Sequence, residues 1–420
     1  MAAISSLHTL LEERCNNRVL QIFGEHVRTQ NNFHSRLDEI DHKEVVIQGQ
    51  RLLNFNAINY LGLEFHPRMI EAAQEAIGRW GTLAGSARAA AEIKAFEELE
   101  YRLASFLGVD NVILFTTVTL ANHGIIPLLM RKRSLILQDW EVHSSVQQAA
   151  TEAKGGGAGL LTFKHDDFDE LEELLKENRD RYKHIMIALD GVYSMLGTYL
   201  DLPQYEELAA KYDALLFVDD AHGFGCIGEG GRGIVSHYGS NYDNIVYVGS
   251  LEKSLASLGG FVVLPHFARD LVRFTSSTYI FSGQLPPPYL YSGLAALDIL
   301  ENEGQQLIDR LNESTRYVKE ELAEMGFELV AEDQPSPLIL VKVGDVYAAP
   351  QVSQFFFDEG IHILTTGFPI IPIDRGAMVR ISMSAAHTDE QIERLLDAFR
   401  KLREVPYCKT RAPGAGRCPL

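Results

Sequence analysis

The sequence predicts an α/β protein with a mostly parallel central sheet and a smaller C-terminal α+β domain. The chain has 420 residues, 46% of them hydrophobic, which is enough to fill two cores. Short apolar runs alternate with helix-period segments between about residues 111 and 263, the rhythm of βαβ units. Beyond them the pattern changes to three apolar strands and one terminal helix, which is typical of a separate α+β unit.

The first 45 residues are expected to form an N-terminal helical arm, because apolar residues recur at helical spacing from Leu7 to about Gln30. Residues 46–285 are expected to form the large α/β domain. Its predicted helices include 168–177 and 205–211. Its predicted strands are 112–115, 134–137, 159–163, 184–189, 214–219, 244–249 and 259–264.

The run LPPPYL after Gln284 interrupts the α/β pattern, so we place the domain boundary there. A long helix is predicted from about Tyr291 to Met325. The small domain, 286–405, then contains the strands LILVKV, HILTT and MVRISMS and a helix from Thr388 to Leu402. Residues 406–420 contain Pro and Gly without periodicity and are expected to be a flexible tail.

Charge and composition exclude several classes of function. The formal charge of −19 and the pI of about 5.2 repel a phosphate backbone, so no nucleic-acid partner is expected. The one compact basic run, residues 131–133, has the ordinary interpretation of a solvated loop. Because no stretch approaches 18 uncharged apolar residues and the amino terminus becomes charged early, we expect neither a membrane span nor export. Four scattered cysteines predict reduced thiols in the cytoplasm and no metal site.

Polar residues that could carry chemistry follow four predicted strands. Asp219 ends a hydrophobic strand, and its carboxylate could pair with a protonated pyridine nitrogen. Lys253 follows another strand and could form a Schiff base, while the hydroxyl of Ser250 could bind phosphate. Because open α/β sheets bind ligands at the carboxyl ends of their strands, these side chains are expected to meet.

His143 and Arg380 complete the set. The imidazole of His143 could lie flat on an aromatic cofactor, and the guanidinium of Arg380 could grip a substrate carboxylate with two hydrogen bonds. Each of the four features alone has an ordinary alternative: a helix cap, a surface charge, a polar loop residue and a structural ion pair. Their combination, and not any one of them, predicts a pyridoxal 5'-phosphate (PLP) site.

A second cofactor motif is weaker. Gly223 to Gly228 spells GxGxxG after a strand, the pattern of dinucleotide-binding sites. That motif must open a helix, whereas here more glycines follow up to Gly233. The segment is therefore expected to continue as a glycine-rich loop.

Eight short motifs occur in order along the chain: NYLGL from Asn59, His143, DGVYSM from Asp190, DDAH from Asp219, GRG from Gly231, Lys253, YIFS from Tyr279 and Arg380. Through these motifs the chain resembles, from about residue 45 to 402, the α-oxoamine synthases, PLP-dependent acyltransferases that include serine palmitoyltransferase and 8-amino-7-oxononanoate synthase. The resemblance implies a fold-type I PLP enzyme, a homodimer with shared active sites. It also implies decarboxylative condensation of an L-amino acid with an acyl thioester, carried by coenzyme A or a carrier protein, to give an α-amino ketone.

The resemblance also assigns roles. Lys253 carries the cofactor, Asp219 binds its pyridine nitrogen, and His143 stacks on the ring. His222 and Ser194 contact the region of the ring hydroxyl, and Arg380 takes the amino-acid carboxylate. The phosphate is expected to be bound by Ser250 with backbone groups of Val118 and Thr119, and by Ser282 of the other subunit.

Departures from the family pattern leave alternatives open. They are Ile58 for a polar residue, Ala87 and Ala91 near Arg88, Phe96 for a histidine, Thr117-Val118-Thr119 for a Ser-Gly-aromatic turn, and Glu252 for a small residue. SLASLGGF is similar to a non-catalytic subunit of the family, so a catalytically silent partner subunit is one alternative. A PLP enzyme of another reaction type, an aldolase or aminotransferase, is a second.

Overall fold

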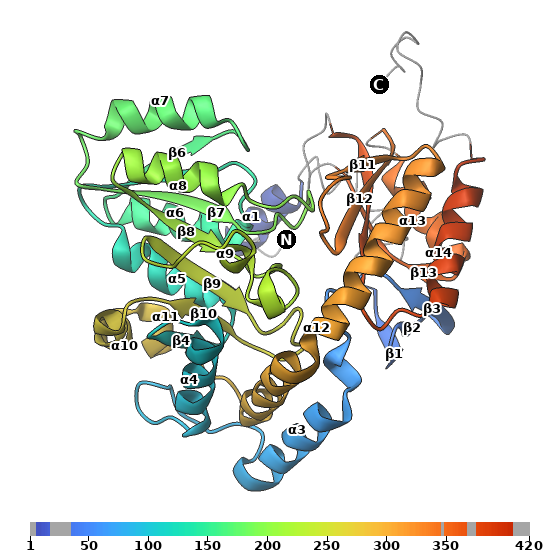
Figure 1. The fold of residues 1–420 in the computed structure, drawn as a ribbon, viewed down its shortest axis with the longest axis horizontal. Coiled ribbons are helices and arrows are strands. Elements are labelled where there is room, and N and C mark those ends of the chain that lie inside the picture. The colour runs from blue at the N-terminus through green and yellow to red at the C-terminus, as the bar shows by residue number, and fades with distance from the viewer. Residues whose placement is uncertain (1–5, 17–34, 346–347, 368–374, 406–420) are drawn as a thin grey trace, which may run out of the picture.

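The computed structural model describes residues 6–16, 35–345, 348–367 and 375–405, and a seven-stranded sheet forms its larger half (Figure 1). Five neighbouring strands are parallel, and one strand near the edge runs antiparallel to both of its neighbours. The mostly parallel sheet predicted from the sequence is confirmed. In spatial order its strands are β4 (Val112–Phe115), β10 (Gly260–Val263), β9 (Ile245–Ser250), β8 (Ala214–Asp219), β7 (His184–Asp190), β5 (Ser134–Asp139) and β6 (Gly159–Phe163).

Alternating side chains of the strands fill two separate cores. Ile136, Met186 and Phe217 belong to one buried cluster, whereas their neighbours Leu137 and Ile187 belong to the other. Successive strand residues point to opposite faces, so a sheet covered on both sides reads as a continuous apolar run. The covering and connecting helices include α4 (Ala95–Leu107), α5 (Val118–Leu129), α6 (Ser144–Gly155), α7 (Phe168–Asn178), α8 (Leu202–Lys211), α9 (Ile234–His237), α10 (Arg269–Thr275) and α11 (Ser277–Phe281).

The smaller half contains an antiparallel sheet, in the order β11-β12-β15-β14, backed by two helices. The predicted terminal helix is confirmed as α14, with Thr388 as its N-cap in a capping box with Gln391. Its elements are β11 (Glu328–Val330), β12 (Leu338–Gly344), β14 (Leu364–Thr366), β15 (Ala377–Ser382), α13 (Ala349–Asp358) and α14 (Asp389–Leu402). The expected tail, 406–420, lies outside the described residues.

The N-terminal expectation is only partly met. The helix α1 (Ser6–Cys15) is present, but β1 (Leu37–Asp41) and β2 (Glu44–Ile47) make the helical prediction wrong for those residues. A tight turn at His42, with φ 50°, reverses the chain into a hairpin whose alternating residues Val45 and Ile47 are buried. Residues 17–34 of the expected arm lie outside the described residues.

The hairpin joins the C-terminal half of the protein. The strand β3 (Gln50–Asn54) pairs in parallel with β13 (Ile361–His362) in a sheet of order β1-β2-β3-β13. The domain ranges expected from the sequence cut through β2. We therefore propose that residues 37–54 belong with the small domain, as chain-distant strands of one unit.

The predicted long helix is α12 (Pro287–Glu324), which begins earlier than expected. Prolines in its first turn do not break it, because the first N–H groups of a helix have no intrahelical partner. The helix packs on α3 (Pro67–Trp80) and α4 at one end and on α14 at the other, so it links both halves (Figure 1). None of the helices in the described ranges combines the length and hydropathy needed to cross a bilayer.

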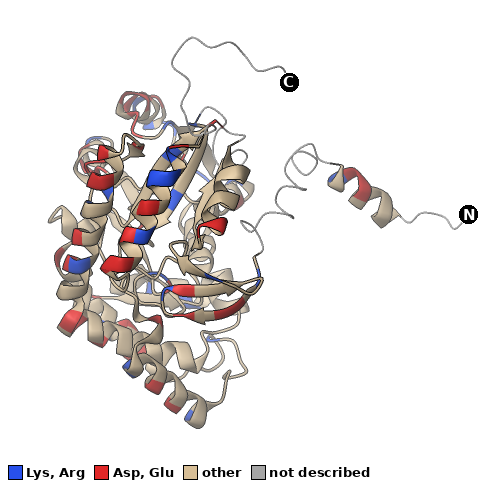
Figure 2. Ribbon diagram, turned by 90° about the vertical axis from the view of Figure 1, so that its right-hand side faces the viewer, with Lys and Arg blue, Asp and Glu red and all other residues tan. Residues whose placement is uncertain are grey.

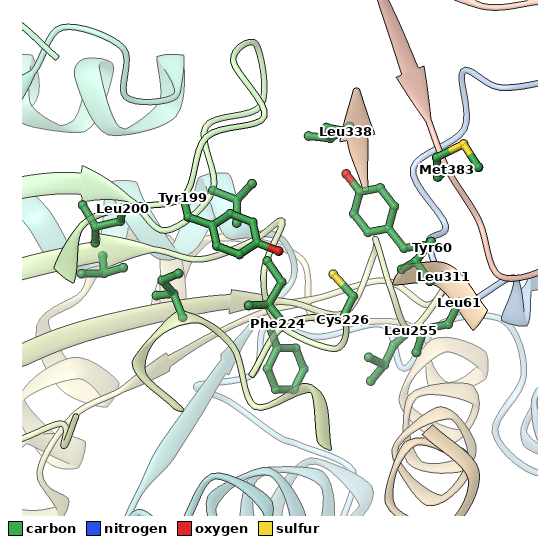
Figure 3. Close-up of a cluster of buried hydrophobic side chains, with 14 of the residues drawn as sticks. Tyr60, Leu61, Tyr199, Leu200, Phe224, Cys226, Leu255, Leu311, Leu338 and Met383 are labelled. Atoms are coloured by element: carbon green, nitrogen blue, oxygen red, sulfur yellow. The ribbon is translucent and has the colours of Figure 1, made fainter. Parts of the chain in front are cut away.

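A buried cluster also joins the two halves. Tyr60 and Met383 from one side approach Cys226 and Leu255 from the other (Figure 3). All four side chains are at most 2% exposed. Basic and acidic residues are interspersed along the helices in the view of Figure 2.

The glycine-rich segment after β8 packs around the carboxylate of Asp220. The Asp220 carboxylate is buried, and its Oδ2 accepts hydrogen bonds from the amide of Ile234 at 2.7 Å and the hydroxyl of Tyr247 at 2.8 Å. Burial raises the pKa of Asp220 to about 7, although the two hydrogen bonds oppose the rise. GxGxxG therefore does not open a helix here, as expected, and its glycines make room for a structural carboxylate.

We predict that Gly233→Ala strongly destabilises the fold. Gly233 has φ +91°, and a Cβ there would lie 2.3 Å from both Asp220 Oδ2 and the Tyr247 hydroxyl. Left-handed strain plus overpacking should lower the free energy of unfolding by about 2–5 kcal/mol. The control is Gly239→Ala, with φ +65° and nothing within 4 Å of the added Cβ. Thermal unfolding compares the two, and equal losses would contradict the packing account.

Candidate active site

Acidic residues meet at the carboxyl edge of the parallel sheet. Asp190 ends β7 and Asp219 ends β8, and the two are register partners. Ser250 ends the next strand, β9, and Lys253 follows within the loop. The structure thus brings together residues that the sequence places far apart, at the edge where open α/β sheets bind ligands.

The Asp219 carboxylate is held in a fixed position. It is 4% exposed, and its Oδ2 accepts a hydrogen bond of 2.7 Å from the Asn122 side chain. Oδ1 accepts from the amide of Ala221 at 3.2 Å. Asn122 lies on α5 and also donates to Ser145 Oγ at 2.9 Å, so it ties two helices to the carboxylate. We did not predict Asn122 from the sequence, because it falls inside a helix with no motif around it.

Asp190 orients the loop that bears His143. Its two carboxylate oxygens accept from the amide of His143 at 3.2 and 3.0 Å. Burial, reinforced by the neighbouring charge of Asp219, raises the pKa of Asp190 well above its usual range. The raised pKa favours the neutral form of the Asp190 carboxyl group.

His143 is the N-cap of α6, with Nδ1 2.8 Å from Ser145 Oγ. The residue is exposed, so part of the ring surface is open to a ligand. Partial desolvation lowers the pKa of His143, and Lys253 adds to this effect while Asp219 opposes it. A neutral imidazole is therefore favoured beside Asp219 and Lys253.

Lys253 has neither a hydrogen bond nor an ion pair to any residue that the structure describes. Burial lowers its pKa, although the charges of Asp219, Glu252 and Asp190 oppose the shift. A buried lysine without a partner is costly as a cation. The arrangement therefore favours the neutral amine, the form that reacts with carbonyl compounds.

His222 lies between the lysine and the small domain. Its Nδ1 is 2.6 Å from the hydroxyl of Tyr60, a residue of the NYLG motif. Burial lowers the pKa of His222 well below its usual value, and the charges of Lys253 and Arg380 lower it further. Nε2 has no hydrogen bond among the described residues, so it remains available to a ligand.

Arg380 reaches the cluster from β15. Its Nη1 makes only long contacts, 3.4 Å to the carbonyl oxygen of Ser194 and 3.7 Å to Met195 Sδ. Its Nε is buried without a hydrogen-bond partner. No carboxylate of the described residues forms an ion pair with it, so the expected alternative, a structural ion pair, does not apply. Burial lowers the pKa of this guanidinium.

The start of α5 offers backbone N–H groups to an anion. Thr117 caps the helix by accepting from the amide of Leu120 at 3.2 Å, and Val118 and Thr119 begin its first turn. A Cβ on Gly260 would lie 2.5 Å from the Val118 nitrogen, so glycine permits β10 to approach closely. Ser250 is fully buried, and its Oγ accepts from the amide of Glu252 at 3.1 Å.

Ser282 is not linked to the Lys253 cluster by a contact within the described chain. Its hydroxyl donates to the carbonyl oxygen of Thr278, and the residue lines a small cavity with Arg88 and Gln284. Ser194 lies in the turn after β7 and takes part through its carbonyl contact with Arg380. A role for Ser282 would require a second subunit.

The departures from the family pattern have partners of their own. The guanidinium of Arg88 lies 4.3 Å over the Phe96 ring and pairs with Glu92 and Glu100. The guanidinium of Arg88 is therefore already paired with protein groups inside the core. Ile58 is partly buried against the main hydrophobic cluster. Burial raises the pKa of Glu252, which weakens the repulsion that its charge would exert on a phosphate.

Comparison with known proteins shows which family has this fold and sequence. The family model for aminotransferase class I and II matches residues 50–399. The chain is 36% identical over 358 residues to an 8-amino-7-oxononanoate synthase of Symbiobacterium thermophilum, covering 85% of this chain and 90% of that one. It is 31% identical over 374 residues to a serine palmitoyltransferase of Bacteriovorax stolpii, covering 89% and 87%.

Its fold is similar to a solved structure of SPT with PLP, with TM-score 0.86, 28% identity and coverage of 96% of this chain and 98% of that one. This likeness confirms the fold type that the sequence resemblance implied. The match spans the sheet, the Lys253 cluster and the strand that carries Arg380. The chain therefore belongs to the aminotransferase class I and II family, among relatives of the α-oxoamine synthase type.

Proposed function

We propose that the protein is a PLP-dependent α-oxoamine synthase. It condenses an L-amino acid with an acyl thioester and releases thiol and carbon dioxide, giving an α-amino ketone. The observation that carries the proposal is Lys253, a partly buried amine with no hydrogen bond or ion pair to the described residues, beside the fixed carboxylate of Asp219. The guanidinium of Arg380, which forms no ion pair with a described carboxylate, adds a site for an amino-acid carboxylate.

The residues fit PLP. Lys253 supplies the amine, and Asp219 supplies a buried negative charge for a protonated ring nitrogen. His143 offers an open ring face, and Nε2 of His222 offers a hydrogen-bonding group, with Ser194 nearby, for the ring hydroxyl. The first-turn amides of Val118 and Thr119, together with Ser250, suit the phosphate because helix N-termini attract anions.

When bound, PLP withdraws electrons from the α-carbon of an amino acid. The residues of this chain make that withdrawal effective and specific. The Asp219 carboxylate would pair with the ring nitrogen of bound PLP, and Asn122 holds that carboxylate so that it would not reorganise during turnover. Arg380 orients the substrate by its carboxylate. His143 and Lys253 are the groups placed to hold or move a proton.

We further propose a homodimer with shared active sites. Among the described residues the Ser282 hydroxyl bonds only to the Thr278 carbonyl oxygen, so a second subunit is the route by which it would reach a phosphate. Reduced thiols are compatible with a cytoplasmic protein, because Cys15 and Cys226 are free among the described cysteines.

Two other functions remain to be tested. A silent partner subunit, suggested by SLASLGGF, need not keep Lys253, Asp219 and Arg380 free for ligands, which this chain does. An aldolase or aminotransferase would use the same cofactor residues. Release of free thiol from an acyl thioester, measured with a thiol reagent in the presence of an amino acid, separates the synthase from both.

We predict that Lys253 is the residue to which the cofactor attaches. Purified protein should be yellow, and borohydride reduction should leave a pyridoxyl group on the peptide that contains Lys253, as found by mass spectrometry. Lys319 is the internal control, because burial lowers its pKa to about 8 but its amine donates to backbone carbonyls. A colourless protein that PLP cannot reconstitute, or a label on Lys319, would refute the assignment.

Loss of the Asp219 charge should abolish most turnover while some cofactor binding remains. Asp219→Asn should lower kcat by about 10²–10⁴-fold, the range for other preorganised electrostatic groups. Asp220→Asn is the matched control, because Asp220 faces the glycine-rich loop and Tyr247 instead. Near-normal turnover in Asp219→Asn, with loss in Asp220→Asn, would reverse the two roles.

Arg380→Ala should weaken binding of every amino acid and leave the cofactor in place. Loss of a two-bond contact to a desolvated carboxylate should cost about 2–5 kcal/mol. Arg380→Lys should recover little, because an ammonium lacks the planar fork. Titration of the cofactor absorbance with amino acid measures the effect, with Arg68→Ala as a control. Unchanged affinity in Arg380→Ala would exclude this role.

A further inference from the structure

An ion pair connects the His143 loop with the start of β15. Arg375 donates from Nη1 to Glu141 Oε2 at 3.1 Å and from Nη2 to Glu141 Oε1 at 2.6 Å. The Glu141 side chain is 12% exposed and that of Arg375 is 28% exposed. Exposed single contacts contribute little, but this pair is two-pronged and mostly buried, so its geometry is well defined.

The backbone of Glu141 is held by Asp139. Its amide donates to Oδ1 of the fully buried Asp139 at 2.8 Å. Oδ2 of Asp139 accepts from the Tyr193 hydroxyl at 2.9 Å and lies 2.8 Å from Nδ1 of His165. Burial alone would lower the pKa of His165, but the hydrogen bond and charge of Asp139 outweigh it and raise that pKa. A positive His165 would strengthen this anchor.

These contacts continue from Tyr193 through Arg380 and Arg375 back to Glu141. Tyr193 precedes Ser194, whose carbonyl oxygen contacts Arg380. Arg380 and Arg375 are joined by the first residues of β15, and Arg375 returns to Glu141. Because the contacts of the Arg380 guanidinium are long, its aim depends on where β15 lies relative to the large domain.

We propose that Glu141 and Arg375 are positioning residues for the amino-acid carboxylate. Their ion pair sets β15, and so Arg380, against the loop that bears His143. The pair touches neither the cofactor nor the substrate; it acts through Arg380. The inference rests on the proposed function, since it assigns Arg380 to the substrate.

The test is a double-mutant cycle with Glu141→Gln and Arg375→Gln. Cofactor absorbance is titrated with L-serine, L-alanine and glycine in turn. Each single variant should raise the half-saturating concentration by about 10- to 100-fold, the scale of a small misplacement of a binding group. The double variant should be no worse than the worse single one, because both lose the same contact. Arg375→Lys keeps the charge and should lie between.

A second readout follows the pair without any ligand. The chain has two tryptophans, Trp80 and Trp140, and Trp140 precedes Glu141 and is 62% exposed. In a Trp80→Phe background, time-resolved anisotropy of Trp140 should show greater local mobility in both variants. Arg68→Gln, which breaks an exposed ion pair to Asp298, should change neither readout.

The outcomes are distinct. Unchanged amino-acid affinity in variants that retain cofactor, additive losses in the double variant, or an unchanged Trp140 signal would each overturn the positioning role. A wild-type protein that responds to no amino acid would instead overturn the proposed function, because the pair could then have no carboxylate to position.

Discussion

The buried, hydrogen-bonded carboxylate of Asp219 is the constraint on which the site depends. A carboxylate at the end of a central strand is costly unless hydrogen bonds stabilise it, and Asn122 and the amide of Ala221 supply them. Burial, reinforced by the neighbouring Asp219, raises the pKa of Asp190, whose carboxyl oxygens accept from the amide of His143. The Asp219 carboxylate is also the main electrostatic partner of Lys253, which forms no ion pair within the described ranges.

Asp220 shows how adjacent residues acquire different roles. In a strand, successive side chains face opposite ways, so Asp219 faces the ligand edge and Asp220 faces the glycine-rich loop. Asp220 organises that loop through Ile234 and Tyr247. One carboxylate thus faces the ligand site, and its neighbour stabilises the adjacent loop. The small domain, linked through α12, brings Arg380 to the same edge of the sheet.

The sequence predicted the parallel strands well, because residues buried on both faces read as uninterrupted apolar runs. It also predicted which polar residues follow those strands. The prediction of a helical arm was wrong for β1 and β2, because the helical spacing of the preceding residues does not continue into them. Asn122, Tyr60 and the pair Glu141–Arg375 could not be assigned roles, since each acts through a partner 97, 162 or 234 positions away. Such contacts depend on tertiary packing, which local patterns do not encode.

The resemblance to α-oxoamine synthases assigned residue roles that geometry alone would leave open. The family itself is confirmed by the match to aminotransferase class I and II and by the similar relatives. The residues that depart from the family pattern are compensated locally: Arg88 is stacked on Phe96 and neutralised by two glutamates, and Ile58 packs into the core. The departures therefore alter the surroundings of the site and leave its central carboxylate and lysine in place.

The most direct measurement of the central claim is a crystal structure of the protein after soaking with PLP. The account predicts continuous density from Lys253 Nζ to the cofactor, with the ring nitrogen within hydrogen-bond distance of Asp219 and the phosphate at the start of α5. A cofactor bound elsewhere, or a ring nitrogen directed away from Asp219, would contradict it.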